Sequence, residues 1–442
     1  MLTEQILIDR ALQGRGRGAG LAAPQAVELA IATRPTLSGE QEEMIRRLTR
    51  DGDAVAIVVG AAGTGKTFAL AAAREAWEAS GTPVIGAAIA WRAARGLDEG
   101  AGMPSTSVAA LLAHVDRGWL PRHAVLVVDE AAMVPTRQLS QLAETLRRAH
   151  GKLVLVGDDR QLPEIEAGGA FRGLRARLPV IELHENRRQV ASWERDALAL
   201  LRDGRGDEAL EHYRAHDRVC LGGGDDLRAQ LVADWWSSGE TASEVMLAYQ
   251  RDDVADLNRR ARERMVAAGA VSGPEVIVGG RPFAAGDRVL LRRNDRRLGV
   301  ANGDRALVLR ADVDSRRLIV CVRGRGVALG SDYLDAGARP AVQHGYAMTG
   351  HAAQGLTVGR ALVLATEETS REWLYMAMSR GRLENRLYGA SARAQERDEI
   401  APAEPPRDAA QVLDIAVQRS AAQRMAIDSR VRARERDLGR GL

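Results

Sequence analysis

Lysine and cysteine are both scarce in this 442-residue sequence. Only two of its 62 Lys and Arg residues are lysine, Lys66 and Lys152, so arginine carries almost all of the positive charge. The two cysteines, Cys220 and Cys321, are too few for a disulfide framework or a four-ligand zinc site, and the eight histidines form no H-E-x-x-H or H-x-H cluster. This cysteine usage predicts a reducing, cytoplasmic compartment.

Long apolar runs and a strong net charge are also absent. No stretch approaches the roughly 18 consecutive apolar residues of a membrane span, and the first ten residues carry acid and base without a signal-peptide core. We therefore expect neither membrane insertion nor secretion by that route. Aromatic residues make up 4% and the formal net charge is +3, so composition alone does not indicate nucleic acid as a partner.

What is present is the composition of a globular protein. With 45% hydrophobic and 27% charged residues the chain is not globally disordered, and its length suffices for about three domains. From Leu37 onward short aliphatic runs alternate with amphipathic helical patterns, which indicates parallel sheets covered on both faces. The expected strands are residues 54–59, 84–88, 125–128, 153–156, 245–249 and 361–365.

Changes in composition divide the chain into segments. The Arg/Gly-rich stretch 14–20 is typical of a flexible connection, and short β patterns separated by Gly and Asp turns predict a small β-rich insertion after residue 275. The expected segments are 1–36, a lead-in; 37–190, a first α/β domain; 191–242, a helical connection; 243–275 together with 341–395, a second α/β domain; 276–340, the insertion; and 396–442, an Arg/Ala-rich helical tail.

One motif runs from Gly60 to Thr67. Its letters, GAAGTGKT, fit G-x-x-x-x-G-K-[ST] directly after the strand 55–59 and before the helix 68–79. Glycines let successive backbone N–H groups point at one phosphate, the lysine reaches the terminal phosphates, and the threonine hydroxyl binds Mg²⁺. A plain Gly-rich turn is the alternative. The expected nucleotide-binding residues are Gly60, Gly63, Thr64, Gly65, Lys66, Thr67 and Phe68.

Polar residues follow two further strands. Asp129 and Glu130 come after the strand 124–128, at the edge where a doubly wound sheet binds phosphates. We expect Asp129 to hold Mg²⁺ through water and Glu130 to orient and deprotonate the attacking water, although any strand can end in a polar loop. Gln161 stands in a Gly-Asp turn after the strand 153–156, where its amide could touch the γ-phosphate.

Two arginines are candidates for the positive charge that phosphoryl transfer requires. Arg188 lies in NRRQ at 186–189 and Arg380 in SRGR at 379–382. An arginine finger is worth about 10³ to 10⁵ in rate. Because arginine is so frequent here, a solvated surface position is the alternative for each, and only their place in the series of motifs favours these two.

Together the motifs resemble those of superfamily 1 DNA helicases. The nucleotide cradle, VLVVDE, VGDDRQLP, NRRQ, GYAMTGHAAQGLTV and YMAMSR occur in the order and spacing of motifs I to VI. The TGHAAQG string and the β-rich insertion resemble the RecD-like branch, which moves 5′ to 3′, and within it the helicase portion of TraA-type (MobF-like) conjugative relaxases. The likeness covers roughly residues 25–390.

The resemblance implies a fold and a set of roles. The fold class is α/β, with two RecA-like P-loop NTPase domains that contain parallel sheets, ATP in the cleft between them, and an SH3-like β-rich insertion in the second. Gln41 would read adenine, Arg188 would be the motif IV finger and Arg380 the finger of the second domain. The implied catalytic residues are Lys66, Glu130, Gln161, Arg188 and Arg380, and the implied Mg²⁺ ligands are Thr67 and Asp129.

DNA contacts are implied as well. Thr349, His351 and Gln354 of motif V would couple a single strand to the nucleotide, and the insertion would press against DNA. At motif Ia, Trp91 and Arg92 stand where the family commonly has a Pro-Thr-Gly-Arg string, so these two side chains are the expected contacts there.

Other aromatic and basic side chains have two interpretations. Trp91 and Tyr346 could stack on bases or pack in a core. The arginine clusters could contact phosphates or form a solvated charged face; they are Arg46, Arg47 and Arg50, and Arg292, Arg293, Arg296 and Arg297.

The motifs favour an ATP-dependent DNA helicase or translocase, moving 5′ to 3′ and related to conjugative DNA transfer. Its expected partners are single-stranded or tailed duplex DNA and a relaxase or conjugation machinery. A DNA-stimulated ATPase that remodels a partner without unwinding is the alternative; a decayed binding module is disfavoured because Lys66, Glu130 and Arg380 are all present. No H-x-H cluster or catalytic-tyrosine domain precedes residue 37, so we do not expect the chain to nick DNA.

Overall fold

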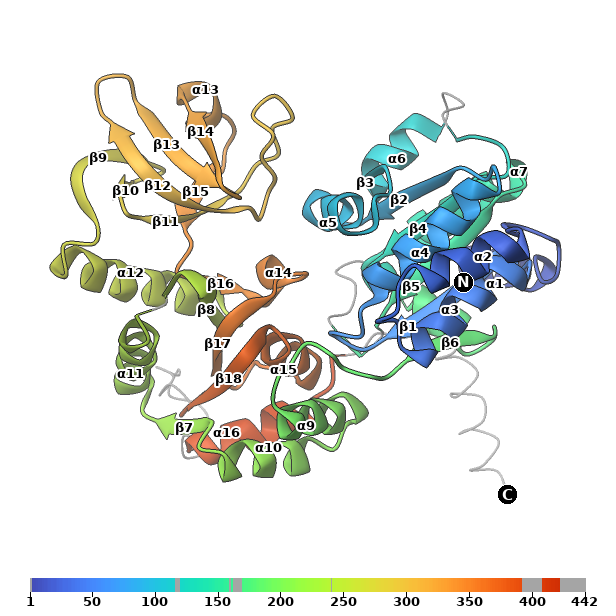
Figure 1. The fold of residues 1–442 in the computed structure, drawn as a ribbon. Helices are drawn as coiled ribbons and strands as arrows, with labels where there is room; N and C mark the ends of the chain where they lie inside the picture. The colour runs from blue at the N-terminus through green and yellow to red at the C-terminus, as the bar shows by residue number, and fades with distance from the viewer. Residues whose placement is uncertain are drawn as a thin grey trace. The chain divides into compact units, whose positions relative to one another are not determined.

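A computed structural model of the protein describes residues 2–115, 120–158, 160–161, 169–239, 241–391 and 408–421. The chain forms two compact units, and the division between them lies between Arg188 and Gln189. Figure 1 labels the helices and strands of both units.

The first unit is built on a sheet of six parallel strands in the order β3-β2-β4-β5-β1-β6. The strands are β1 (Val55–Gly60), β2 (Val84–Ala88), β3 (Ser105–Ser107), β4 (Val125–Asp129), β5 (Lys152–Gly157) and β6 (Val180–Leu183). Ile57 and Val59 of β1 join one apolar cluster and Val58 joins another, so both faces of the strand are buried. The prediction of a parallel sheet covered on both faces is therefore confirmed.

Helices supply the two apolar clusters of this sheet. On one face α1 lies against α7 and α8, and Leu7 and Leu139 pack in the cluster that contains Ile57. On the other face α2 and α3 contact α4, and Met44 and Leu70 pack with Val58. The helices are α1 (Leu2–Gln13), α2 (Pro24–Ala32), α3 (Gly39–Arg50), α4 (Lys66–Ala79), α5 (Trp91–Ala101), α6 (Val108–Val115), the 3-10 turn η1 (Ala131–Met133), α7 (Thr136–Arg148) and α8 (Ala170–Arg175).

The N-terminal lead-in is part of this unit, and the expected flexible connection at residues 14–20 is instead held in place. Ala19 donates a backbone hydrogen bond to the carbonyl of Gly52, and the indole of Trp77 donates to the carbonyl of Gly20 at 2.7 Å. Gly20 has φ of +61°, in the left-handed region that favours glycine. The glycines of this stretch therefore serve a fixed turn against the core rather than a loose linker.

The second unit is built on a sheet of five parallel strands in the order β16-β8-β17-β18-β7. The strands are β7 (Val219–Gly222), β8 (Glu244–Ala248), β16 (Ala347–Thr349), β17 (Val358–Ala365) and β18 (Gly381–Ala390). The helices are α9 (Ser192–Asp203), α10 (Gly206–Ala215), α11 (Gly224–Ser237), the 3-10 turn η2 (Thr241–Ser243), α12 (Arg251–Ala267), α14 (Gly350–Ala353), α15 (Arg371–Met378) and α16 (Ala409–Gln418).

Two elements of this unit differ from expectation. The stretch 191–242, expected as a helical connection, supplies β7, whose Val219 pairs with Leu387 of β18. Helix α15 ends at Met378, and Gly381 begins β18, a strand that is not among those expected from the sequence. The first half of β18 is polar, which is why its sequence does not read as a buried strand.

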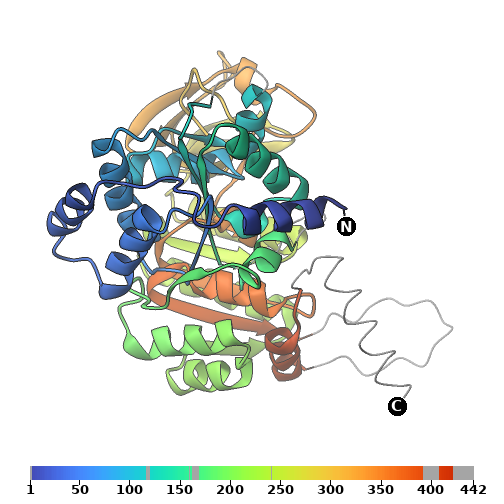
Figure 2. The same cartoon turned by 90° about the vertical axis from the view of Figure 1, so that its right-hand side faces the viewer.

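The insertion interrupts the second unit between α12 and β16. It contains a five-stranded antiparallel sheet, β14-β13-β12-β11-β15, and a two-stranded one, β10-β9. Its elements are β9 (Ser272–Val278), β10 (Arg281–Ala285), β11 (Arg288–Leu291), β12 (Arg305–Asp312), β13 (Arg317–Val322), β14 (Arg325–Leu329), α13 (Ser331–Leu334) and β15 (Val342–His344). Figures 1 and 2 show it at the end of the second unit opposite α9, α10 and α16. The β-rich insertion is confirmed, and its likeness to an SH3 fold stays a prediction.

A buried carboxylate joins the insertion to the rest of the second unit. Asp287 is fully buried, and it accepts hydrogen bonds from the Tyr346 hydroxyl at 2.7 Å and from Nε of Arg262 on α12 at 3.1 Å. The ring of Tyr346 packs edge-on against Trp235, with centroids 5.7 Å apart. Of the two interpretations of Tyr346, the structure therefore shows core packing.

Candidate active site

The loop between β1 and α4 contains close approaches that only glycine permits. A Cβ on Gly60 would lie 2.7 Å from Cδ of Lys66, and one on Gly65 would lie 2.5 Å from Nε2 of Gln41. Gly65 also has φ of +72°, and α4 begins directly after it at Lys66. The loop thus ends on the positive end of a helix, which is the backbone arrangement that binds phosphate.

The Lys66 side chain folds back over this loop. Its Nζ donates to the carbonyls of Gly60 at 2.8 Å and Ala61 at 3.1 Å. An ammonium group with three N–H donors can exchange such carbonyls for phosphate oxygens. Thr67 follows as the second residue of α4, one helical position after Lys66.

Two carboxylates lie at the end of β4. Burial raises the pKa of Asp129, against the opposing attraction of Lys66 and a hydrogen bond from the Glu130 N–H, which is 2.8 Å from Oδ1. Glu130 itself has φ of +53°, so the chain turns sharply between the strand and η1. Asp129 is half-buried, and a carboxylate withdrawn from water is costly unless a cation is near, so the residues present fit a divalent ion at Asp129.

Gln161 lies beyond β5, which runs between β4 and β1 in the sheet. Its Nε2 is 3.3 Å from Oδ2 of Asp158, and its N–H donates to the Asp158 carbonyl at 3.1 Å. Strands β1, β4 and β5 are parallel, so their carboxyl ends lie at the same edge of the sheet. The loop of Lys66, the carboxylates Asp129 and Glu130, and Gln161 all follow strands at this edge. The neighbouring motif residues Asp159, Leu162 and Pro163 and the string 165–168 lie outside the described residues.

Arg188 lies beside the nucleotide loop in the first unit. The N–H of Arg187 donates to the Gly63 carbonyl at 2.9 Å, and a Cβ on Gly63 would lie 2.6 Å from Cβ of Arg188. Gly63 therefore has to be glycine because the NRR segment crosses it, and the Asn186 side chain steadies that segment by accepting from the Arg188 N–H at 2.9 Å. The structure thus brings together two motifs that are more than a hundred residues apart.

Gln41 ties α3 to the same loop. Its Oε1 accepts from the Ser38 N–H at 3.0 Å in a capping box, and its Nε2 donates to the Thr64 carbonyl at 2.9 Å. The side chain is almost fully buried. These contacts give Gln41 a role in holding the loop, whereas its reading of adenine stays a prediction.

In the second unit, motif V packs on the helix that carries motif VI. Thr349 ends β16, His351 is in α14 and Gln354 caps it. A Cβ on Gly350 would lie 2.3 Å from Nε1 of Trp373 on α15, so glycine is required where the two motifs touch. The three expected DNA contacts therefore lie at the end of β16 and along α14, the short helix that packs on α15.

Arg380 follows Ser379, the C-cap of α15, and its guanidinium is hydrogen-bonded within its own unit. Nε donates to the Met376 carbonyl at 2.8 Å, one terminal nitrogen to the Leu356 carbonyl at 3.3 Å, and the other to Oγ of Ser379 at 2.7 Å. Leu356 belongs to the motif V loop. The arginine thus connects motifs V and VI.

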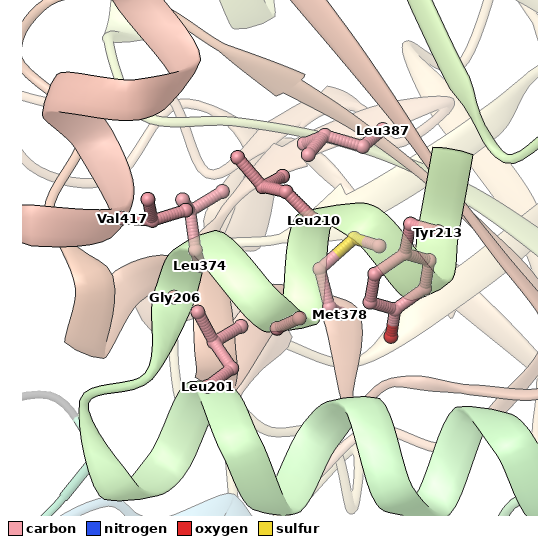
Figure 3. A pocket seen from close by; sticks show the side chains of 9 residues that line it. Leu201, Gly206, Leu210, Tyr213, Leu374, Met378, Leu387 and Val417 are labelled. Carbon is pink, nitrogen blue, oxygen red and sulfur yellow. The ribbon is translucent and has the colours of Figure 1, made fainter. Parts of the chain in front are cut away.

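Helix α15 packs on apolar side chains of its own unit. Leu374 and Met378 of α15 line a small pocket with Leu201 of α9, Leu210 of α10 and Val417 of α16 (Figure 3). The lining is apolar and suits no nucleotide or metal. These side chains pack α15 against α9, α10 and α16, which restrains the helix that precedes Arg380.

The expected DNA contacts of the first unit have partners within the chain. Trp91, the first residue of α5, is half-buried and has the Arg95 guanidinium 4.2 Å from its ring centroid. Arg46 and Arg50 both pair with Glu28, at 3.3 and 2.6 Å. For these arginines the structure favours the solvated charged face. Arg92, next to Trp91, is also half-buried.

Three residues around the turn of Arg380 have contacts that the sequence does not predict: Gln189, Glu194 and Asn385. All three are buried polar side chains in the second unit. Gln189 belongs to the NRRQ string, but nothing in that string predicts which groups its amide binds. Glu194 and Asn385 carry no motif, and only their packing reveals them.

Within the described part of the chain, no helix is long and apolar enough to cross a membrane, and no group of three or more His, Cys, Asp or Glu side chains could hold a metal ion. Both cysteines are free.

Several known proteins are similar to this chain. Residues 36–223 match the AAA domain family. The chain is 37% identical to the conjugal transfer protein TraA of Rhizobium radiobacter over 383 residues, which cover 84% of this chain and 34% of that protein. It is 29% identical to the ATP-dependent RecD2 DNA helicase of Deinococcus radiodurans, over 81% of this chain and 50% of that protein. The chain thus spans about a third of the length of the TraA relative.

A solved structure supports the fold. The Pif1 helicase of Bacteroides, in complex with ADP-AlF3 and single-stranded DNA, aligns with a TM-score of 0.57 at 19% identity, covering 79% of this chain and 92% of that one. The predicted resemblance to the RecD-like branch of superfamily 1 helicases is thereby confirmed: the relatives of this chain are TraA conjugal transfer proteins and, more distantly, RecD helicases, and its fold is that of Pif1 helicases.

Proposed function

We propose that the chain is an ATP-dependent DNA helicase or translocase that moves 5′ to 3′ along single-stranded DNA. The observation that carries this proposal is the edge of the first unit's sheet, where the loop of Lys66, the carboxylates Asp129 and Glu130, and Arg188 come together. The loop that ends on the N-terminus of α4 fits a triphosphate, and the half-buried Asp129 fits a divalent cation.

Each residue of this edge has a proposed task. The loop glycines 60, 63 and 65 leave space for the side chains of Lys66, Arg188 and Gln41 and let backbone N–H groups face the phosphates. Thr64 shapes the loop, and Phe68 lies on the first turn of α4 beside the nucleotide. Lys66 neutralises the terminal phosphates, and Thr67 and Asp129 hold Mg²⁺, which when bound withdraws negative charge from the phosphate oxygens. Gln161 contacts the γ-phosphate and reports its presence.

Hydrolysis requires a base and positive charge, which we assign to Glu130 and to two arginines. Glu130 takes a proton from a water molecule whose oxygen bonds to the γ-phosphorus, while the bond from that phosphorus to the β-γ bridging oxygen breaks and leaves ADP. Arg188 and, from the second unit, Arg380 stabilise the negative charge that develops on the transferred phosphoryl group.

Motion along DNA is proposed for the second unit. Motif V packs on α15, and Arg380 in the turn after α15 donates to the Leu356 carbonyl of motif V, so a change at Arg380 is transmitted mechanically to Thr349, His351 and Gln354. Trp91 and Arg92 of the first unit are the proposed contacts to the other part of the strand. We further propose that the insertion holds DNA as an SH3-like module, that relaxase or conjugation proteins are the partners, and that the activity is cytoplasmic.

The experiment that tests this function compares two activities of the same preparation. A helicase should show ATPase activity that single-stranded DNA stimulates, together with strand displacement on a 5′-tailed duplex. A DNA-stimulated ATPase that remodels a partner should show the first activity and no displacement. Absence of ATPase activity with DNA and Mg²⁺ would refute both.

A further inference from the structure

Two amide side chains hold the turn that carries Arg380. Nε2 of Gln189 donates to the Ser379 carbonyl at 3.2 Å and to the Gly381 carbonyl at 2.8 Å. These are the carbonyls on either side of Arg380, so a single side chain spans the arginine. Gln189 is almost fully buried, which makes both hydrogen bonds costly to lose.

Asn385 holds the same turn from β18. Its Oδ1 accepts from the Gly381 N–H at 2.7 Å, and its Nδ2 donates to the Gly381 carbonyl at 3.0 Å. A Cβ on Gly381 would lie 2.6 Å from this Oδ1, so a glycine must follow Arg380 for the contact to form. Both backbone polar groups of Gly381 are therefore bound by one side chain.

Glu194 of α9 binds the Asn385 amide. Its Oε1 accepts from Nδ2 and from the backbone N–H of Asn385, each at 3.0 Å. Since the backbone N–H of Gly381 can only donate, the amide oxygen of Asn385 must face Gly381, and the amide nitrogen donates to Glu194. Burial also raises the pKa of Glu194 to about 7.

We infer that Gln189 and Asn385 are positioning residues for Arg380, which set the direction of its side chain by fixing the backbone on both sides of it. This inference rests on the proposed finger role of Arg380. Gln189 also comes immediately after Arg188, which lies against Gly63 of the nucleotide loop. Two consecutive residues therefore have different contacts: Arg188 lies against the loop of Gly63, and the Gln189 amide binds the turn that carries Arg380.

The test measures steady-state ATP hydrolysis with saturating oligo(dT) for four proteins: wild type, Gln189→Met, Arg380→Ala and the double variant. Methionine keeps the length of the side chain and removes both hydrogen bonds. We expect kcat to fall roughly 10- to 100-fold in Gln189→Met, as for a misplaced catalytic group, while KM for ATP changes less than about threefold. Gln230→Ala, an exposed glutamine on α11, is the control and should leave kcat unchanged.

The double variant separates positioning from general stability. If Gln189 acts through Arg380, Gln189→Met should cause no further loss of kcat once Arg380 is alanine. An equal loss in both backgrounds, or wild-type kcat in Gln189→Met, would overturn the inference. Should Gln189→Met not fold, Gln189→Asn, a neutral amide that is one methylene too short to span both carbonyls, replaces it with the same expectations. A wild-type kcat in Arg380→Ala would instead refute the finger role itself.

Discussion

Replacing Lys152 by methionine should stabilise the protein at neutral pH. Lys152 begins β5 and is fully buried, and its Nζ has no hydrogen-bond partner among the described residues. The lead-in turn covers it, because a Cβ on Gly20 would lie 2.5 Å from its Cδ. Asp51 and Asp53 attract the ammonium from a distance, but burial outweighs them and lowers its pKa to about 8.

The size of the effect follows from that pKa. The amine has an ordinary pKa of 10.5 in the unfolded chain and about 8 in the folded one, a difference that corresponds to about 3 kcal/mol. Below pH 8 both states are protonated and the full cost of burying the charge is present. Between about pH 8 and 10.5 the unfolded chain binds more protons, so the stability of the wild type rises with pH. Lys152→Met should thus gain up to about 3 kcal/mol at pH 7 and little at pH 10.5.

Urea denaturation followed by circular dichroism at pH 7 and pH 10 measures both quantities. Lys152→Arg is the control, because a guanidinium does not lose its proton in this range and should be less stable than lysine at both pH values. A methionine variant that is less stable than the wild type at pH 7, or whose gain does not depend on pH, would refute the reasoning.

Other variants test the site and the surface. Lys66→Ala should abolish ATP hydrolysis while single-stranded DNA binding, measured by fluorescence anisotropy, stays measurable; hydrolysis at the wild-type rate would contradict the cradle. Glu130→Gln should bind ATP yet turn it over at least about 100-fold more slowly in a rapid-filtration assay, since the base for water is lost; unchanged turnover would exclude it as the base. The pair Arg46→Ala with Arg50→Ala should leave the salt dependence of DNA affinity unchanged, because both arginines pair with Glu28; a shallower slope would show that they contact phosphate.

The parallel sheets could be read from the sequence because their strands are buried on both faces. Val84–Ala88 and Val125–Val128 are unbroken apolar runs, and the structure contains them as β2 and β4. The nucleotide loop was equally legible, since its glycines and Lys66 are consecutive in the chain.

Other features depend on contacts distant in sequence. The first half of β18 is polar because it carries Asn385 and exposed side chains, so nothing marked it as a strand. The need for glycine at position 63 comes from Arg188, and the role of Gln189 comes from Ser379 and Gly381. Spacing along the chain cannot encode such pairs.

Of the two lysines, one has a position that a sequence motif predicts, and the other has a position that depends on contacts distant in sequence. Lys66 has a compact ammonium group, and the GAAGTGKT motif predicts its place at the nucleotide loop. Lys152 is a lysine rather than an arginine and can therefore lose its proton when buried, and no pattern in the sequence predicts that burial.

The proposed motor is tested by strand displacement on two substrates that differ only in the polarity of the tail. With ATP and Mg²⁺, the 442-residue chain should unwind a duplex with a 5′ single-stranded tail and leave the matching 3′-tailed duplex intact, and Lys66→Ala should unwind neither. Displacement of the 3′-tailed duplex alone would contradict the 5′ to 3′ direction, and DNA-stimulated ATP hydrolysis without displacement of either substrate would contradict the helicase.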